Sequence, residues 1–313
     1  MKTRKYLYLA FFFIIIFHAN SLLSGAFFPE NDIKTRETGS AVIHYPGQLE
    51  NAARQIERLY PVLRSELEQT LHLPVDFKPN IRLVNDRQRF REATGSDMVV
   101  AVAIPARNLM VIDYTRMADS PFMLRTTLKH ELSHLLLHRH IDPDILPRWI
   151  DEGVSQWVTG GVSELVTDPG WSVLENAAMR DNLYRFDELD TFPSGRSETM
   201  LAYQQSKSFI EYVVEVYGES ALIEILHEMS RNASADRAFA TVLPHTLRQV
   251  ERNWSNDIQA RVTWFTYISR NMFQFIFLFA ALLVIIAFIK MMIQRRRRYD
   301  DEDEFDDLPS DDR

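Results

Sequence analysis

The chain of 313 residues contains no cysteine. This absence excludes disulfide bonds, cysteine nucleophiles and metal sites with thiolate ligands. It also excludes a lipid anchor attached to a cysteine of this sequence. Any metal site in the chain must therefore be built from histidine and carboxylate side chains, which bind zinc through nitrogen and oxygen.

The sequence has no excess of positive charge and no internal repeat. Lysine and arginine number 35 against 43 aspartate and glutamate residues, which gives a formal net charge of −8. Because no basic stripe crosses the region between the two ends of the chain, we expect no nucleic-acid partner. That region has roughly 240 residues, enough for a full hydrophobic core in one domain or in two small lobes.

The N-terminus has the layout of a secretory signal. Basic residues precede an apolar run at 6–17, and the small residues Ser-Gly-Ala follow at 24–26. This layout predicts a signal peptide at 1–26, cleaved so that the mature chain begins at Phe27. An uncleaved anchor is the alternative, which the shortness of the apolar run disfavours.

A second hydrophobic segment covers residues 272–293. About twenty apolar residues match the thickness of a bilayer core, so we expect a transmembrane helix here. Four arginines follow at 295–298, and positive charge beside a span stays on the cytoplasmic side. We therefore expect a single-pass protein of the cell membrane, with residues 27–268 forming an extracytoplasmic domain.

The C-terminal segment at 294–313 is expected to lie in the cytoplasm. From residue 299 onward it carries nine acidic residues and one arginine. Such a run is usually solvated and disordered, although it could dock a cytoplasmic partner.

Hydrophobic periodicity predicts an α+β domain followed by helices. Strands are expected at residues 39–45, 80–84, 99–104 and 108–113. Helices are expected at residues 49–71, 122–137, 197–217, 219–230, 234–241 and 246–267, and a further helix that carries Glu152 is expected to start near Pro147. Residues 27–38 show no clear pattern and are interpreted as a linker or a short inhibitory segment.

The stretch from His130 to His134 reads H-E-x-x-H. Residues four apart lie above one another on a helix, so His130 and His134 can offer two imidazoles to one metal ion. Glu131 points roughly a quarter-turn away and can reach a water on the open side of the ion. The alternative is a helix with two ordinary histidines and a surface glutamate. The helix expected at 122–137 favours the metal site, because its leucines form a core stripe beside the histidines.

A catalytic zinc ion usually takes three protein ligands and leaves one position for water. The candidates for the third ligand are Glu152, eighteen positions after His134, and His140, six positions after it. A third ligand only six positions after His134 requires the chain to turn sharply. In the metzincin pattern a glycine three positions after the second histidine allows this turn. Leu137 stands at that position and favours a continued helix, so we predict Glu152. His138 and His140 are then expected to be surface or helix-end histidines.

Three blocks carry a resemblance to a known family. They are H-E-L-S-H at 130–134, P-R-W-I-D-E-G-V-S at 147–155 and A-Y-Q-Q-S-K-S-F-I-E-Y-V-V-E-V-Y-G at 202–218. The chain resembles the gluzincin metallopeptidases, and more closely the bacterial peptidase MA-like metallohydrolases, from about residue 41 to about residue 254. The resemblance implies a thermolysin-like zincin domain, with a small mixed sheet, a helical lobe and one zinc ion between them.

The resemblance also implies roles for single side chains. In such enzymes the glutamate of the E-G pair is the third zinc ligand and the glutamate of H-E-x-x-H is the general base. These positions correspond to Glu152 and Glu131. A tyrosine often stabilises the oxyanion of the reaction; Tyr203 is the candidate, and a structural tyrosine is the alternative. A carboxylate is expected to hold one zinc-bound histidine, and Asp151 and Asp113 are both candidates.

The sequence therefore predicts a membrane-anchored zinc metallopeptidase that hydrolyses peptide or protein substrates outside the cytoplasm. The predicted zinc ligands are His130, His134 and Glu152, and the predicted catalytic residues are Glu131 and Tyr203. The alternatives are an inactive zinc-binding scaffold protein and a structural membrane protein in which the motif arises by chance. The strand at 99–104 or at 108–113 could pair with an extended peptide substrate.

Overall fold

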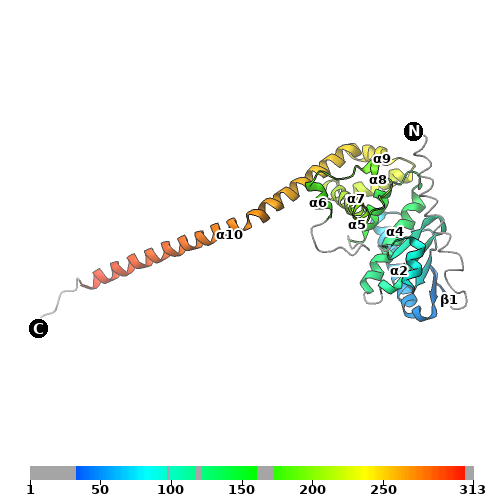
Figure 1. The fold of residues 1–313 in the computed structure, drawn as a ribbon, viewed down its shortest axis with the longest axis horizontal. Coiled ribbons are helices and arrows are strands. Elements are labelled where there is room, and N and C mark those ends of the chain that lie inside the picture. The colour runs from blue at the N-terminus through cyan, green and yellow to red at the C-terminus, as the bar shows by residue number, and fades with distance from the viewer. Residues whose placement is uncertain (1–32, 97–98, 118–120, 161–172, 307–313) are drawn as a thin grey trace. The chain divides into compact units, whose positions relative to one another are not determined.

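The computed structural model describes residues 33–96, 99–117, 121–160 and 173–306 (Figure 1). The signal peptide expected at 1–26 lies outside these residues. The chain divides into two units, residues 1–256 and residues 257–313. The first unit holds a sheet and most of the helices, so it is an α+β domain, as the hydrophobic pattern predicts.

Within the described residues, a five-stranded sheet has the strand order β1-β2-β3-β5-β4. The strands are β1 (Ile33–Glu37), β2 (Val42–Pro46), β3 (Asn80–Val84), β4 (Ala101–Ile104) and β5 (Leu109–Asp113). β2, β3 and β5 run parallel, whereas β1 and β4 pair antiparallel with their neighbours. β1 and β4 are therefore the two edges of the described sheet.

Residues 27–38 were expected to form a linker or an inhibitory segment; β1 corrects this for residues 33–37, whereas residues 27–32 lie outside the described residues. Residues 33–37 pair with β2 along the whole strand. Arg36 forms ion pairs with Glu50 and Glu57 of helix α2 (Glu50–Leu71). The run I-K-T-R-E has one aliphatic residue, so its strand conformation comes from pairing with β2 rather than from a hydrophobic pattern of its own.

Helices pack against the sheet. α2 contacts β2, α4 (Pro121–His140) contacts β4 and β5, and the two helices contact each other. The short helix α3 (Arg87–Thr94), which the hydrophobic pattern did not predict, packs Phe90 against Leu109 and Val111 of β5. All five residues of β5 are buried, as expected for a strand covered on both faces. The sheet thus gives α4 a rigid base.

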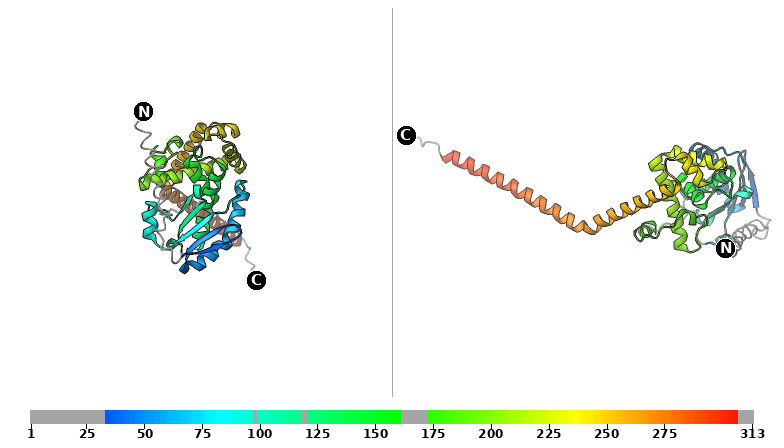
Figure 2. Two further views of the ribbon diagram at one scale, coloured as in Figure 1. Left: turned by 90° about the vertical axis from the view of Figure 1, so that its right-hand side faces the viewer. Right: turned by 90° about the horizontal axis from the view of Figure 1, so that it is seen from above.

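The remaining helices of the first unit pack around a core of aromatic rings. They are α5 (Arg148–Val158), α6 (Val173–Met179), α7 (Arg196–Tyr217), α8 (Glu219–Ser230) and α9 (Ala235–Val242). Figure 2 shows them in green and yellow beside the blue-to-cyan sheet. The rings of the core belong to Trp149, Phe186, Phe209, Phe239 and Trp254. Because α5 contacts both α4 and α7, it links the sheet to this helical part.

Helix α10 (Leu247–Asp306) begins in the first unit and continues into the second. Its segment Asn271–Ile293 is long and apolar enough to cross a membrane, in agreement with the span predicted at 272–293. The acidic tail was expected to be disordered, but the helix extends into it as far as residue 306. Between Leu247 and Leu308 the sequence has no glycine or proline. The helix therefore meets no helix-breaking residue before Pro309.

Candidate metal centre

Helix α4 places the two histidines of H-E-x-x-H on one face. Six leucines of the helix are buried: Leu124, Leu128, Leu132, Leu135, Leu136 and Leu137. They hold the helix in the core while His130 and His134, one turn apart, bring their Nε2 atoms 3.1 Å from each other. His130 is 6% exposed and the side chain of His134 is 12% exposed. Both imidazoles therefore converge on one largely buried point.

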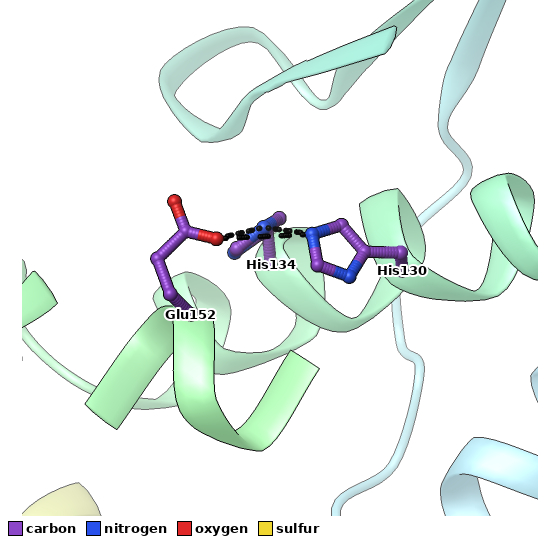
Figure 3. A group of neighbouring side chains, drawn as sticks. All are labelled: His130, His134 and Glu152. Carbon is purple, nitrogen blue, oxygen red and sulfur yellow. Dashed lines mark hydrogen bonds and ion pairs between the residues drawn. The ribbon is translucent and has the colours of Figure 1, made fainter. Parts of the chain in front are cut away.

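Glu152 reaches the same point from α5. Its Oε2 lies 3.8 Å from Nε2 of His130 and 3.6 Å from Nε2 of His134, and Figure 3 shows this oxygen facing both rings. The three ligand atoms lie within 4.8 Å of one another. Tetrahedral zinc with bonds of 2.0–2.1 Å places neighbouring ligand atoms roughly 3.3–3.4 Å apart. This donor set of two nitrogens and one oxygen thus fits a divalent ion such as zinc.

The second carboxylate oxygen of Glu152 points away from the histidines (Figure 3). The hydroxyl of Tyr203, on α7, donates a hydrogen bond of 3.2 Å to this Oε1. Nε of Arg148 lies 3.6 Å from the same oxygen. The structure thus brings Tyr203 to the site, with its hydroxyl on Glu152, and its role as an oxyanion donor stays a prediction.

Asp151 holds His134 from the side opposite the cluster. The Nδ1 atom of His134 donates to Oδ1 of Asp151 at 2.8 Å, and Nε2 of His138 donates to Oδ2 at 3.0 Å. The other candidate, Asp113, instead accepts hydrogen bonds from Arg87 at 3.1 Å and from the hydroxyl of Thr115 at 2.6 Å. Asp151 is therefore the carboxylate that orients a histidine of the cluster.

The two remaining histidines of α4 have different surroundings. α4 continues through Leu137 and ends at His140, and Nε2 of His140 donates to the carbonyl of Pro74 at 2.8 Å. His140 thus lies outside the cluster, as Leu137 led us to expect. His138 also lies in the last turn, but its bond to Asp151 makes it more than a surface histidine, and the helix pattern gave no sign of this contact.

Burial and neighbouring charges set the protonation of the histidine pair. Burial lowers the pKa of His130 to about 3, and the charge on His134 adds to this effect. Burial alone would also lower the pKa of His134, but the negative charges of Asp151 and Glu152 raise it to about 10. The pKa of Asp151 is held well below its ordinary value by His134, although burial alone would raise it. A proton thus stays on the pair, and a metal cation binding there would displace it.

Glu131 follows His130 on α4 and is 3% exposed. It is the next residue to His130 on the helix, and its negative charge contributes to the raised pKa of His134. A carboxylate beside the cluster, rather than within it, is suited to exchange protons with a reacting water. The role of Glu131 as a general base stays a prediction.

Some residues that contact the site were not singled out from the sequence, among them Ser155, whose Oγ lies 3.2 Å from Nδ1 of His134, and two others. The two others are Arg148, which precedes Glu152 by four positions on α5, and Phe192, whose ring lies 4.7 Å from the guanidinium carbon of Arg148. The spacing of Arg148 and Glu152 is the one that brings opposite charges together on a helix, so this pair could have been found. Phe192 had no comparable signal, because its contacts depend on tertiary packing.

The chain also matches proteins of known sequence. A family model described as the Peptidase MA superfamily matches residues 86–260, which include α4, α5 and α7. The chain is similar to the uncharacterised protein YhcO of Bacillus subtilis (strain 168), with 25% identity over 147 residues. That match covers 44% of this chain and 42% of the relative, less than half of either. Because the family match spans more than half of the chain, this protein belongs to the Peptidase MA superfamily.

Proposed function

We propose that this protein is a membrane-anchored zinc metallopeptidase of the gluzincin type, with a thermolysin-like zincin domain. The observation that carries the proposal is the group formed by His130, His134 and Glu152, whose ligand atoms lie within 4.8 Å of one another. Membership of the Peptidase MA superfamily supports peptide-bond hydrolysis as the reaction. The ligands come from two packed helices, so the site is held in place before a metal binds.

The chemistry follows from the groups around this site. Zinc held by the three ligands would supply a Lewis acid that polarises the scissile carbonyl and acidifies a water molecule. Glu131 would accept a proton from the attacking water and deliver it to the nitrogen of the leaving amine. Its low exposure would limit competition from bulk water. A donor from Tyr203 to the oxyanion remains part of the prediction that the family resemblance implies.

Strand β4 is the proposed binding edge for an extended substrate. It pairs with β5 on one side and has no second partner among the described strands. β5 is paired on both sides, so residues 108–113 are disfavoured as the peptide-binding edge. α4, which carries both histidines, contacts β4. A peptide added at β4 would bind mainly through its backbone, with little sequence preference.

Anchoring would come from the candidate span Asn271–Ile293. The proposed organisation is a signal peptide at 1–26, an extracytoplasmic domain at 27–268, a span at 272–293 and a cytoplasmic tail at 294–313. The four arginines after the span favour the cytoplasmic side for the tail. Substrates would then be peptides or proteins at the outer surface of the cell membrane.

The proposed function is tested on the full-length protein purified in detergent. Wild type is expected to bind about one zinc ion per chain and to hydrolyse unfolded casein. Glu131→Gln keeps the shape of the side chain but removes its basicity, so it should retain zinc and lose hydrolysis. Hydrolysis by Glu131→Gln at the wild-type rate would show that the assigned base is wrong.

Two further variants test the ligand set. Glu152→Ala is expected to lose zinc, whereas His140→Ala should keep both zinc and activity, because His140 contacts Pro74 instead of the cluster. Zinc binding by wild type without hydrolysis would favour an inactive zinc-binding scaffold protein. A well-folded wild-type protein that binds no zinc would contradict the metal site altogether.

A further inference from the structure

The two carboxylate oxygens of Glu152 have different surroundings. Oε2 faces the imidazoles of His130 and His134 at 3.8 and 3.6 Å. Oε1 accepts the hydrogen bond from Tyr203 at 3.2 Å and lies 3.6 Å from Nε of Arg148. Glu152 is 7% exposed, so water contributes little to either oxygen. One oxygen is thus directed at the cluster, and the other is held by the hydroxyl of Tyr203 and by the charge of Arg148.

The ring of Phe192 contacts both Arg148 and Tyr203. The guanidinium carbon of Arg148 lies 4.7 Å from the centroid of its ring, which suits a cation on an aromatic face. The ring of Tyr203 meets that of Phe192 edge to face, with centroids 5.0 Å apart and planes at 89°. Phe192 is itself 6% exposed. One buried ring, in the segment between α6 and α7, therefore packs against two side chains that belong to different helices.

The close approach of α5 and α7 brings Tyr203 within reach of Glu152. A Cβ atom added at Gly153 would lie 2.7 Å from the backbone oxygen of Ser206 on α7. Nε2 of Gln156, on α5, donates to the backbone carbonyl of Tyr203 at 3.2 Å. The distance between the tyrosine and the glutamate is therefore set by backbone packing rather than by flexible surface side chains.

We propose that Arg148, Phe192 and Tyr203 form a clamp on Oε1 of Glu152, which holds this residue as a metal ligand through Oε2 alone. Turning Oε1 towards the metal would break its hydrogen bond in a buried site and separate it from the Arg148 charge. Tyr203 is in this arrangement a positioning residue that acts through Glu152. The inference rests on the proposed function only in requiring a metal at the cluster; it does not require peptide hydrolysis.

A positioning role and an oxyanion role predict different results for Tyr203→Phe. A donor used only in the transition state affects kcat and leaves metal affinity unchanged. A donor that orients a ligand affects metal affinity, by about 10- to 100-fold. Zinc affinity measured against a competing chelator, and the visible absorption spectrum of the cobalt-substituted protein, report on the ligand geometry without any substrate.

The experiment compares full-length wild type in detergent with Tyr203→Phe, Arg148→Gln and the control Tyr217→Phe. Tyr217 lies on the same helix as Tyr203, but its ring contacts His245. The two clamp variants are expected to bind zinc about 10- to 100-fold more weakly, with altered cobalt spectra, while the control matches wild type. Arg148→Lys, which keeps the charge, should recover part of the affinity lost in Arg148→Gln.

The outcomes separate the clamp from the proposed function. The Arg148 side chain is 37% exposed, so its replacement is expected to leave the protein folded. Arg148→Gln therefore tests the clamp even where Tyr203→Phe fails to fold. Unchanged zinc affinity and cobalt spectra in folded clamp variants would overturn the clamp, and a fall in hydrolysis for Tyr203→Phe would then assign that residue to the oxyanion. A wild type that binds zinc but hydrolyses no peptide would overturn only the proposed function, since zinc affinities still decide the clamp.

Discussion

At the scale of single residues, Asp151 joins two histidines of α4 through its two carboxylate oxygens. Its bond to Nδ1 of His134, at 2.8 Å, fixes the ring so that Nε2 faces the cluster. Its bond to Nε2 of His138, at 3.0 Å, fixes the carboxylate in turn. A carboxylate in this place also makes the imidazole a stronger ligand, because it stabilises positive charge on the ring.

Asp151→Asn is expected to weaken zinc binding by about 10- to 100-fold, because the amide keeps the shape of the side chain and loses its charge. Competition with a chelator measures the change. His138→Ala should give a smaller loss, since His138 reaches the cluster only through Asp151. Asp144→Asn, at an exposed position between α4 and α5, is the control. Wild-type zinc affinity in a folded Asp151→Asn protein would refute the role assigned to this carboxylate.

The three residues of the cluster could be predicted from the sequence because their signals are local. The helical period places His130 and His134 together, and Leu137 indicates that the helix continues and leaves the third position to Glu152. The contacts of Phe192 and Tyr203 with the site could not be predicted in the same way. They form only when α7 packs on α5, and the periodicity of the sequence does not predict this packing.

At the scale of elements, the packing of α5 on α7 depends on Gly153. An added Cβ would lie 2.7 Å from a backbone oxygen of α7, which cannot move without shifting the helix. Gly153→Ala should therefore destabilise the protein by about 1–3 kcal/mol through overpacking, although alanine has the higher helix propensity. Denaturant unfolding measures this. Gly39→Ala, where an added Cβ meets nothing within 4 Å, is the control, and equal midpoints for both variants would contradict the argument.

The contact between β1 and α2 makes stability depend on pH. Glu50 accepts hydrogen bonds from the hydroxyl of Tyr45 at 2.9 Å and from Nη2 of Arg36 at 2.7 Å. These bonds lower the pKa of Glu50 from 4.5 to about 2. A carboxylate whose pKa is lowered by folding contributes stability above its unfolded pKa, and the contribution is lost as the pH falls through the folded value.

Glu50→Gln is therefore expected to lower the Tm at neutral pH. The difference from wild type should shrink as the pH falls from 4.5 towards 2, because wild type then loses the same charged contact. Thermal unfolding followed across this range measures the effect. Glu224→Gln, at an exposed position of α8, is the control and should follow wild type. A deficit in Glu50→Gln that stays constant with pH would show that the charge of Glu50 is not the cause.

The elements that the sequence predicted have strong hydrophobic patterns, and those it missed, β1, α3 and α6, are short. β3 (Asn80–Val84) and α8 (Glu219–Ser230) have the predicted bounds. Helix α3 has one large apolar residue, Phe90, and its apolar pattern is therefore too sparse to predict a helix. Its ends did carry signals, since the Asp86 side chain caps the first turn and Gly95 follows the last residue with a φ of 68°.

At the scale of the whole molecule, the proposed topology depends on signals at the two ends of the chain. The candidate span Asn271–Ile293 lies within the described residues, and the signal peptide expected at 1–26 lies outside them. The arginines at 295–298 predict that the C-terminal tail faces the cytoplasm. The cluster of His130, His134 and Glu152 would then lie on the outer side, where it would meet extracytoplasmic substrates.

The absence of cysteine makes this topology directly testable, because a single introduced thiol can be labelled without background. Ser65 is exposed on α2, and Ser310 lies in the C-terminal tail. A membrane-impermeant maleimide applied to sealed spheroplasts is expected to label Ser65→Cys, and to label Ser310→Cys only after permeabilisation. The unsubstituted protein is the control and should not react. Labelling of Ser310→Cys in sealed spheroplasts, without labelling of Ser65→Cys, would place the cluster of His130, His134 and Glu152 in the cytoplasm. It would exclude an extracytoplasmic peptidase.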